Sequence, residues 1–204
     1  MGSRFDFRRL LASPLAYRVL GALTGEAGRS RFVHTHVRPE PGMRILDIGC
    51  GPGDILAYLP ADIEYLGFDA SPRYISAARE RYGDRAKFFC QVVSAADLRE
   101  TAGFDLVLAS GVLHHLTDSE AIDLFTLAKQ ALLARGRLVT LDGCFAPGQS
   151  WAARMMLRMD RGRHVRTQEG YVGLANRVFP RVSCTVWHDM IRLRYTHLVP
   201  ECSA

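Results

Sequence analysis

Short apolar runs recur along the middle of the chain, and stretches with helical periodicity separate them. The strand-type runs are Met43–Ile48, Ile63–Asp69, Ala86–Val93, Phe104–Ser110 and Arg137–Leu141. The helical stretches are Asp54–Leu59, Pro72–Tyr82 and Ser119–Ala134. Two helices have start signals: Ser71 precedes Pro72 as an N-cap, and Thr117 and Glu120 are spaced for a capping box. Apolar strands that alternate with helices predict a parallel sheet covered on both faces.

The pattern changes on either side of this region. Pro14–Leu23 and Glu26–Val37 predict two amphipathic helices, and the prolines of residues 38–42 end the second one. After the alternating region, helices are predicted at Gln149–Met159 and Gln168–Val178, and an adjacent antiparallel pair of strands at Arg181–Met190 and Ile191–Val199. We expect one α/β domain over residues 1–204, with a helical lid (1–38), a ligand-binding core (39–145), and cap helices with closing strands (146–204). Its sheet is doubly wound, mostly parallel and seven-stranded, with antiparallel C-terminal edge strands.

Composition fits this picture and excludes other classes. With 48% apolar and 23% charged residues, the 204-residue chain has the balance of a globular domain. No apolar run reaches the ~18 residues that a membrane span needs. The longest candidate, residues 10–23, contains Pro14 and Arg18, and no clean small-residue cleavage site follows it as a signal peptide requires.

Charge and cysteine content add two expectations. The net charge is +5, and 24 of the 26 basic residues are arginine, a bias that indicates codon composition more than nucleic-acid contact. An anionic partner is permitted but not required. The five cysteines show no CxxC or CxxH spacing, which predicts reduced thiols in the cytoplasm and no zinc site.

A glycine-rich turn between the first predicted strand and the following helix carries the most information. Gly49, Gly51 and Gly53 give the spacing GxGxG, whereas the dinucleotide fingerprint is GxGxxG. Asp54 stands where a pyrophosphate would approach the helix, and no phosphate loop is present, so phosphate-bearing cofactors are disfavoured. A ligand with a ribose and a base but no phosphate fits better. Asp69, 20 residues after Gly49, is at the distance from which an acidic residue accepts the ribose hydroxyls.

Four segments together resemble the class I S-adenosylmethionine-dependent methyltransferases, in order and in spacing, over about residues 40–145. The matching stretches are Leu46-Asp-Ile-Gly-Cys-Gly-Pro-Gly53, Leu66-Gly-Phe-Asp-Ala-Ser-Pro72, Phe104-Asp-Leu-Val-Leu-Ala-Ser-Gly-Val-Leu-His-His-Leu116 and Leu133-Ala-Arg-Gly-Arg-Leu-Val-Thr-Leu-Asp142. The resemblance implies a Rossmann-like fold and S-adenosylmethionine as cofactor. Asp47 then suits the ammonium group or orients the amides of the turn, and Asp69 holds the ribose.

The resemblance also implies which residues bind the cofactor. They are Asp47, Gly49, Cys50, Gly51, Gly53, Asp69, Ala70, Val92, Val93, Ser110 and, from the N-terminal helix, Tyr17 beside Arg18. One position departs from the family pattern: the acidic residue that follows the third strand is replaced by Val92 or, in a shifted register, by Ser94. The Val93 amide can still serve the adenine ring, and Asp97 is a more distant substitute.

Candidate catalytic residues follow the fourth and fifth strands. His114 and His115 stand at the carboxyl edge, where a neutral imidazole is suited to accept a proton from the methyl acceptor; a structural role as loop anchors stays open. Asp142 faces the acceptor or caps the turn at Gly143. Nothing here has the ligand set of a magnesium-dependent catechol site.

The segment 154–166 is the candidate acceptor-recognition region. Arg154, Arg158, Arg161 and His164 suit an anionic small molecule, while the alternative is a solvated helix face. Met155, Met156 and Met159 are predicted to be core, and His188 and His197 to be packing or surface residues.

Three functions remain after this. The leading hypothesis is methylation of a small molecule at oxygen, nitrogen or carbon. An RNA methyltransferase is the second, although Ser110-Gly-Val-Leu-His114 lacks the motif used for exocyclic base nitrogens and no RNA-binding appendage is visible. The third is a non-catalytic, cofactor-binding subunit. The sequence does not indicate an oligomeric state.

Overall fold

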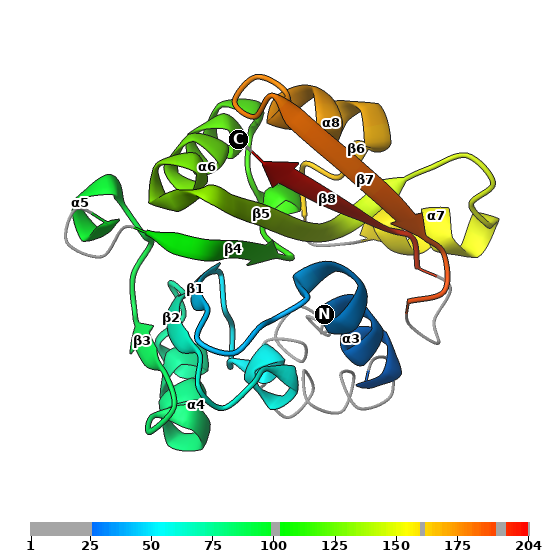
Figure 1. The fold of residues 1–204 in the computed structure, drawn as a ribbon. Coiled ribbons are helices and arrows are strands. Elements are labelled where there is room, and N and C mark those ends of the chain that lie inside the picture. Colours follow the sequence, from blue (N-terminus) through cyan, green and yellow to red (C-terminus); the bar gives the residue numbers. More distant parts are fainter. Residues whose placement is uncertain (1–25, 99–102, 160–161, 191–194, 204) are drawn as a thin grey trace, which may run out of the picture.

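The computed structural model describes residues 26–98, 103–159, 162–190 and 195–203. A seven-strand path crosses the sheet in the order β3-β2-β1-β4-β5-β8-β7 (Figure 1). The strands along that path are β3 (Lys87–Phe89), β2 (Glu64–Phe68), β1 (Arg44–Ile48), β4 (Phe104–Ser110), β5 (Leu132–Phe145), β8 (His197–Ser203) and β7 (Arg181–Trp187). The first five of them pair in parallel, whereas β8 runs antiparallel to both β5 and β7. The predicted doubly wound sheet with antiparallel C-terminal strands is confirmed, and a two-residue strand β6 (Arg166–Thr167) pairs with the end of β5.

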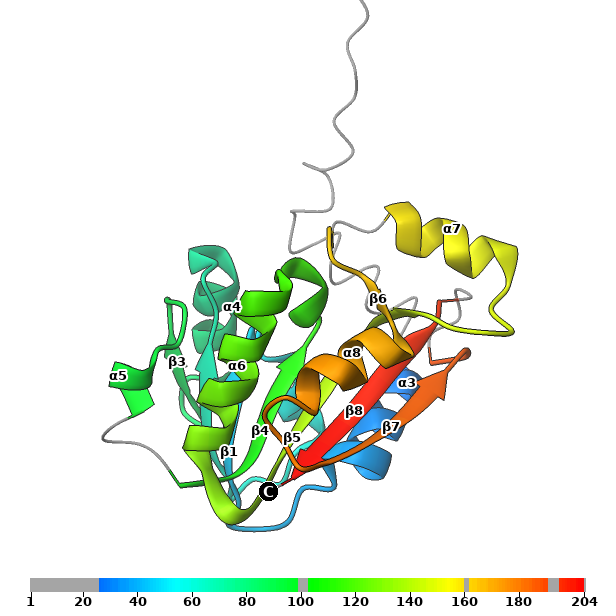
Figure 2. The same ribbon diagram turned by 90° about the horizontal axis from the view of Figure 1, so that it is seen from above.

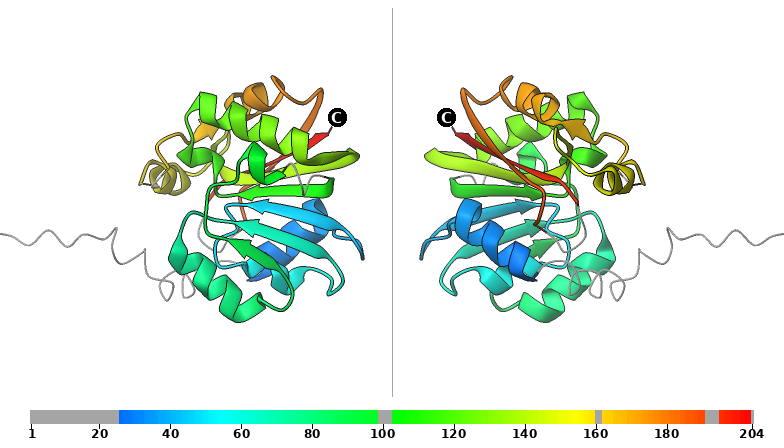
Figure 3. Two further views of the ribbon diagram at one scale, coloured as in Figure 1. Left: turned by 90° about the vertical axis from the view of Figure 1, so that its left-hand side faces the viewer. Right: turned by 90° about the vertical axis from the view of Figure 1, so that its right-hand side faces the viewer.

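Helices cover both faces of the sheet (Figure 3). One face packs against α6 (Asp118–Ala131) and α8 (Gln168–Ala175). The other packs against α3 (Glu26–Phe32) with its π-helical continuation η1 (Val33–Val37), the 3-10 turn η2 (Asp54–Tyr58) and α4 (Pro72–Tyr82). Leu46 of β1 packs in the core on the α6 and α8 side, and its neighbour Ile45 packs in the core on the α3 and α4 side, because successive strand side chains point to opposite faces. The predicted N-terminal helix at Pro14–Leu23 lies outside the described residues.

The two predicted helix starts are confirmed. The Ser71 hydroxyl accepts from the Tyr74 amide at the first turn of α4. Thr117 and Glu120 form a reciprocal capping box at the start of α6. These contacts satisfy backbone donors that have no partner within the helix.

The predicted end of β3 and the predicted start of β5 are wrong, each for a local reason. β3 ends at Phe89 rather than at Val93, because Asp97 draws the chain into a turn by accepting from the Ser94 amide and hydroxyl. β5 begins at Leu132 rather than at Arg137, since α6 ends at Ala131, whose carbonyl is taken by the Gly103 amide.

The last strand starts and ends later than predicted. It runs through Pro200 to Ser203, whereas the sequence pattern ends it at Val199. A proline is tolerated in this central strand because the ladder between β5 and β8 is interrupted around it, with Val139 paired to Glu201 and Asp142 to Leu198. β7 also ends at Trp187, before the predicted Met190.

Helix α7 (Trp151–Met159) projects beyond the end of β5 (Figure 2). The prediction that its methionines are core is wrong for Met155 and Met159, which are 38% and 76% exposed. The helix buries Ala153 and Leu157 instead. Within the described ranges, no helix is both long enough and apolar enough to cross a membrane.

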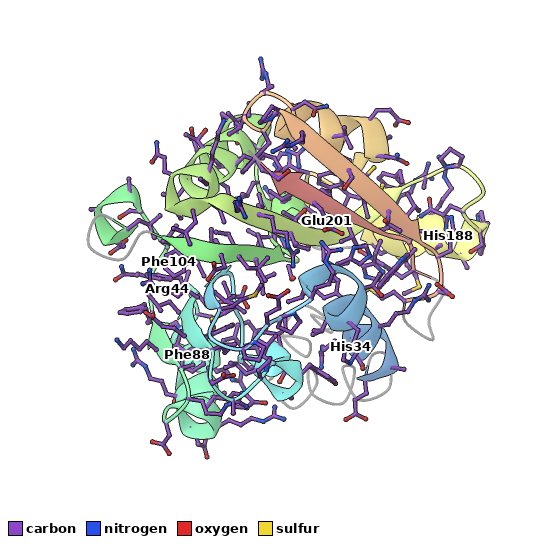
Figure 4. All side chains as sticks on the ribbon, in the orientation of Figure 1. His34, Arg44, Phe88, Phe104, His188 and Glu201 are labelled. Carbon is purple, nitrogen blue, oxygen red and sulfur yellow. The ribbon has the colours of Figure 1, made fainter. Side chains whose placement is uncertain are left out.

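The opposite, amino edge of the sheet is closed by charge contacts. Arg44 at the start of β1 pairs with Glu64 of β2 at 2.8 Å, and its guanidinium lies over the ring of Phe104 at 5.1 Å (Figure 4).

Candidate functional site

The glycine turn after β1 is held against the end of β2. The amides of Gly49 and Cys50 both donate to the carbonyl of Phe68, at 2.7 and 3.0 Å. Gly49 has φ +76°, and a Cβ there would lie 2.5 Å from the side chain of Val112, so only glycine fits. Gly51 has φ +54° with open space beside it. The turn therefore presents bare backbone to a ligand.

Two cavities meet at this turn. Cavity A has a volume of about 750 Å³, and cavity B about 290 Å³. Gly49, Gly51, Ser110 and Gly111 line both of them. The Ser110 hydroxyl is buried and has no hydrogen-bond partner within the described residues. One elongated ligand lying across Gly51 would occupy both cavities, and the larger one has the size of a small-molecule site.

Cavity A is apolar with a few polar groups at its wall. Its apolar lining includes Ile48, Phe68, Leu116, Leu124 and Leu127. Asp69, at the end of β2, accepts from the Gly51 amide at 3.0 Å with Oδ2 and from the Ser71 amide at 2.8 Å with Oδ1. Because each carboxylate oxygen can accept more than one bond, Asp69 can fix the turn and still receive two hydroxyls.

Cavity B contains a buried carboxylate with one free oxygen. Asp47 is 4% exposed; Tyr65 donates to its Oδ2 at 2.6 Å, and Oδ1 has no hydrogen-bond partner among the described residues. Burial raises the pKa of Asp47 to about 7, against the hydrogen bond from Tyr65, which lowers it. An unpartnered carboxylate oxygen at a ligand cavity is suited to a cation, and an ammonium group fits it.

Sequence reasoning missed Tyr65 and Arg29. The parallel register sets Gly67 opposite Asp47, so that Tyr65, two residues earlier, shares its face and reaches it. Arg29 of α3 lines cavity B, with its guanidinium 3.6 Å from the Asp54 carboxylate. Neither position belongs to a motif, so only the strand register and the path of α3 reveal them.

The segment after β3 is the place where the family pattern fails. Val92 lines cavity A and is 77% exposed, and Val93 is buried. Asp97 does not line the cavity; it accepts from the side-chain amide of Gln91 at 2.7 Å, and Gln91 does line it. Gln91 therefore supplies a carboxamide at this wall; one of its two N–H groups donates to Asp97, which leaves the other N–H as a donor and the oxygen as an acceptor.

A histidine–aspartate pair stands where β4 and β5 end. His114 Nδ1 lies 2.7 Å from Asp142 Oδ1, which also accepts the His114 backbone amide at 3.1 Å. Asp142 is 2% exposed, and burial raises its pKa while the contacts to His114 lower it. Its Oδ2 has no hydrogen-bond partner in the described part of the chain. The ring of His114 is 12% exposed and does not line either cavity; a Cβ on Gly111, which lines both, would lie 3.8 Å from its Cε1.

The other predicted residues are distributed as follows. His115 lines cavity A, with its ring centroid 4.0 Å from that of His114. Ala70 lines cavity A, Cys50 lines cavity B, and Gly53 has φ +72° at the start of η2. Tyr17, Arg18 and Arg161 lie outside the described residues.

The remaining acceptor-region residues lie apart from the two cavities. Arg154 and Arg158 are exposed on α7 and line neither cavity. The His164 amide donates to the His114 carbonyl at 3.0 Å. His188 is exposed, with Nδ1 3.2 Å from the Thr196 hydroxyl, and His197 lines cavity B. Across the described ranges, no group of three or more His, Cys, Asp or Glu side chains is placed to hold a metal ion.

The sequence of this chain is similar to those of known methyltransferases. Residues 46–138 match the family model described as a methyltransferase domain. An uncharacterised methyltransferase of Mycobacterium tuberculosis is 30% identical over 113 residues, which are 54% of this chain and 44% of that protein. A ubiquinone biosynthesis O-methyltransferase of Brucella ovis is 35% identical over 107 residues, or 50% of this chain and 41% of that protein. The chain thus spans less than half the length of these curated relatives.

A solved structure extends the likeness of the fold to nearly the whole chain. The TehB-like S-adenosylmethionine-dependent methyltransferase from Corynebacterium glutamicum superposes with a TM-score of 0.65 at 23% identity, covering 93% of this chain and 95% of that one. At this identity the likeness shows the fold. Residues 46–138 are thus similar to a methyltransferase domain model, and the fold of nearly the whole chain is similar to that of an S-adenosylmethionine-dependent methyltransferase of known structure.

Proposed function

We propose that the protein transfers a methyl group from S-adenosylmethionine to a small-molecule acceptor. The observation that carries this proposal is the pair of cavities joined across Gly51, with one carboxylate in each: Asp69 in cavity A and Asp47 in cavity B. This arrangement suits a ligand that has a ribose at one position and an ammonium group at another. The cation that lines cavity B, Arg29, lies 3.6 Å from the Asp54 carboxylate, which disfavours a phosphate at the glycine turn.

Residues of both cavities would hold the cofactor. Asp47 Oδ1 would receive the ammonium group, because it is a buried acceptor that has no other hydrogen-bond partner in the described residues. Asp69 would accept the ribose hydroxyls, and the apolar wall of cavity A would enclose the base. Ser110, Ala70, Val92 and the Val93 amide border the same space or adjoin it. Bound there, S-adenosylmethionine would supply an activated methyl group on a sulfonium.

His114 is the proposed general base for an acceptor that carries a hydroxyl. With its Nδ1–H donating to Asp142, the imidazole has Nε2 as the proton-accepting nitrogen. When the acceptor oxygen takes the methyl group, its proton passes to Nε2, and the Asp142 carboxylate stabilises the imidazolium that forms. A general base of this kind raises the rate of the reaction by about 10²–10⁴-fold. His115, in cavity A, is the alternative base.

The acceptor class is proposed from the same geometry and from one relative. The ubiquinone biosynthesis O-methyltransferase of Brucella ovis is 35% identical to this chain over 107 residues, which favours methylation at oxygen. We keep Arg154, Arg158, Arg161 and His164 as the proposed residues for an anionic acceptor. Arg154 and Arg158 are exposed on α7 and line neither cavity, so such an acceptor would have to reach beyond cavities A and B. We further propose that residues 1–38 act as a lid carrying Tyr17, and that residues 39–145 bind the cofactor.

Localisation in the cytoplasm is proposed on the cysteines alone. Cys50, Cys90, Cys144, Cys184 and Cys202 are all free thiols, which suits a reducing compartment.

The decisive experiment is a calorimetric titration of the purified protein. S-adenosylmethionine and its demethylated product are expected to bind with micromolar affinity, and NADH, the control, is expected not to bind. Binding without turnover on any small molecule or RNA would favour the non-catalytic subunit. Turnover on RNA, with affinity that falls steeply with salt, would favour the RNA methyltransferase.

A further inference from the structure

Arg166 makes an unusual set of contacts with the turn that carries His114. Arg166 is the first residue of β6, and its side chain is 10% exposed. The turn is the 3-10 segment η3 (Leu113–His115), which follows β4. The two segments are about 50 residues apart in sequence, so the contact between them is made only by the fold.

The Arg166 guanidinium donates to main-chain carbonyls on both sides of His114. Its NH1 nitrogen donates to the Leu113 carbonyl at 2.9 Å, and its NH2 nitrogen to the Leu116 carbonyl at 2.7 Å. NH1 also donates to the carbonyl of His164 at 2.9 Å. The fork therefore joins the entry and the exit of η3 to the segment that precedes β6, through a planar group whose donors keep fixed directions.

Two further groups on the Arg166 side fix His114 itself. The His164 amide donates to the His114 carbonyl. Gly162 lies directly on the imidazole, since a Cβ there would come within 2.1 Å of His114 Cδ2. Backbone, ring and turn are all held from one short segment, residues 162–166.

An exposed ion pair completes the set without being essential to it. Asp118 accepts from Arg166 NE and NH2 at 2.9 and 2.8 Å, but the Asp118 side chain is 73% exposed. A surface ion pair of this kind contributes little to the stability of the folded protein. The carbonyl bonds, which are shielded from water, are the part that can fix the turn.

We propose that Arg166 is a positioning residue: it sets the η3 turn so that His114 meets Asp142 in the geometry needed to accept a proton. This rests on the proposed role of His114 as the base. Arg166 touches neither cavity, so its loss is expected to misplace His114 without removing any cofactor contact.

The test uses the proton on the His114 imidazole, which needs neither cofactor nor acceptor. A histidine Nδ1–H bonded to a buried carboxylate gives a far-downfield NMR resonance. Among the described residues, two histidines place Nδ1 2.7 Å from a carboxylate: His114 with the buried Asp142, and His36 with the half-buried Glu201. H114Q and H36Q assign the two resonances, and the His36 resonance then reports whether the fold is intact.

In R166M the His114 resonance is expected to broaden or disappear while the His36 resonance stays. R166K can donate from one point only, so it is expected to restore the resonance in part, and added ethylguanidinium is expected to restore it in R166M. Two variants serve as matched controls. D118N weakens the exposed ion pair, and R177M removes an exposed arginine just after α8; both should leave the two resonances unchanged.

Three results would overturn the proposal. They are an unchanged His114 resonance in R166M, loss of both resonances together, and loss of the His114 resonance in D118N. Once an acceptor is found, R166M should lower kcat by about 10–100-fold with little change in the affinity for S-adenosylhomocysteine. Full turnover in H114Q would refute the base, and with it the proposed function of Arg166, while the NMR result would still measure the contact.

Discussion

Tyr65 donates a 2.6 Å hydrogen bond to one carboxylate oxygen of the buried Asp47, and the other oxygen has no partner among the described residues. The two residues lie on neighbouring strands, β1 and β2, and share one face of the sheet. The protein thus keeps a buried carboxylate, with one oxygen unpaired among the described residues, where the proposed ammonium group would bind. Desolvation favours its neutral form, so both the charge state and the stability of the empty protein depend on pH.

Cofactor affinity is expected to fall as the pH drops below about 7. The pKa of Asp47 is raised to about 7 by burial, so the empty protein carries a mixture of carboxyl and carboxylate at neutral pH. An ammonium group binds the carboxylate, and binding below this pKa must release a proton. The dissociation constant should rise about tenfold per pH unit below the pKa. Calorimetry in two buffers of different ionisation enthalpy measures the proton released; zero release at about pH 6 would contradict the assignment.

Asp47→Asn is expected to stabilise the empty protein while it abolishes cofactor binding. A carboxyl with a raised folded-state pKa binds its proton more tightly in the folded state, so the folding free energy becomes less favourable as the pH rises from about 4 to 7. Asparagine keeps an oxygen for Tyr65 and has no charge to desolvate. The gain should reach up to ~4 kcal/mol at about pH 8, at 1.36 kcal/mol per pKa unit. Melting temperatures at about pH 5, where the parent is already protonated, should differ much less; an equal difference at both pH values would contradict the mechanism.

Asp69→Ala is expected to raise the dissociation constant for S-adenosylhomocysteine by about 100-fold or more, because two charge-assisted hydrogen bonds to the ribose are worth about 1.5–3 kcal/mol each. The variant also loses the hydrogen bonds that the Gly51 and Ser71 amides donate to Asp69 in the parent protein. Asp84→Asn, which changes an exposed carboxylate beyond α4, is the matched control. Affinity within about threefold of the parent in Asp69→Ala would place the ribose elsewhere.

His114→Gln and His115→Gln should separate the base from its neighbour. If His114 is the base, its variant loses turnover by about 10²–10⁴-fold and keeps cofactor affinity. His115 lines cavity A, so His115→Gln should weaken cofactor binding and change kcat little. Asp142→Asn should reproduce the effect of His114→Gln, since it removes the carboxylate that stabilises the imidazolium. The reverse pattern would assign the base to His115.

The sequence predicted the parts of this site that depend on one segment and missed those that depend on pairing. Gly49, Gly51 and Asp69 were found because turn chemistry and strand ends are local properties. Tyr65 and Arg166 were not found, since their partners lie 18 and about 50 residues away in sequence and are set by strand register. The helix at Trp151–Met159 shows the same limit: its periodicity was recognised, but most of its circumference is apolar, and periodicity cannot say which side a neighbour covers.

Glu201→Gln is expected to lower the free energy of unfolding by about 2 kcal/mol, on the scale of a hydrogen bond to a charged group. Glu201 of β8 accepts from His36 at 2.7 Å and from Arg38, and Arg137 lies 3.8 Å away. Burial opposes its ionisation, but the contacts to His36 and Arg38 prevail and hold the pKa of Glu201 below its usual range. A carboxyl group whose pKa is lowered in the folded state adds stability that is present above the unfolded pKa and is lost as the pH falls through the folded pKa.

Denaturant unfolding at about pH 7 and pH 3 should therefore show a difference in the free energy of unfolding between parent and variant that shrinks in acid. Because none of these residues lines cavity A or B, cofactor affinity should not change. A variant that unfolds like the parent at neutral pH would show that the Glu201 contacts do not stabilise the packing of η1 on β8. A variant that binds the cofactor more weakly would show that these contacts also affect the cavities.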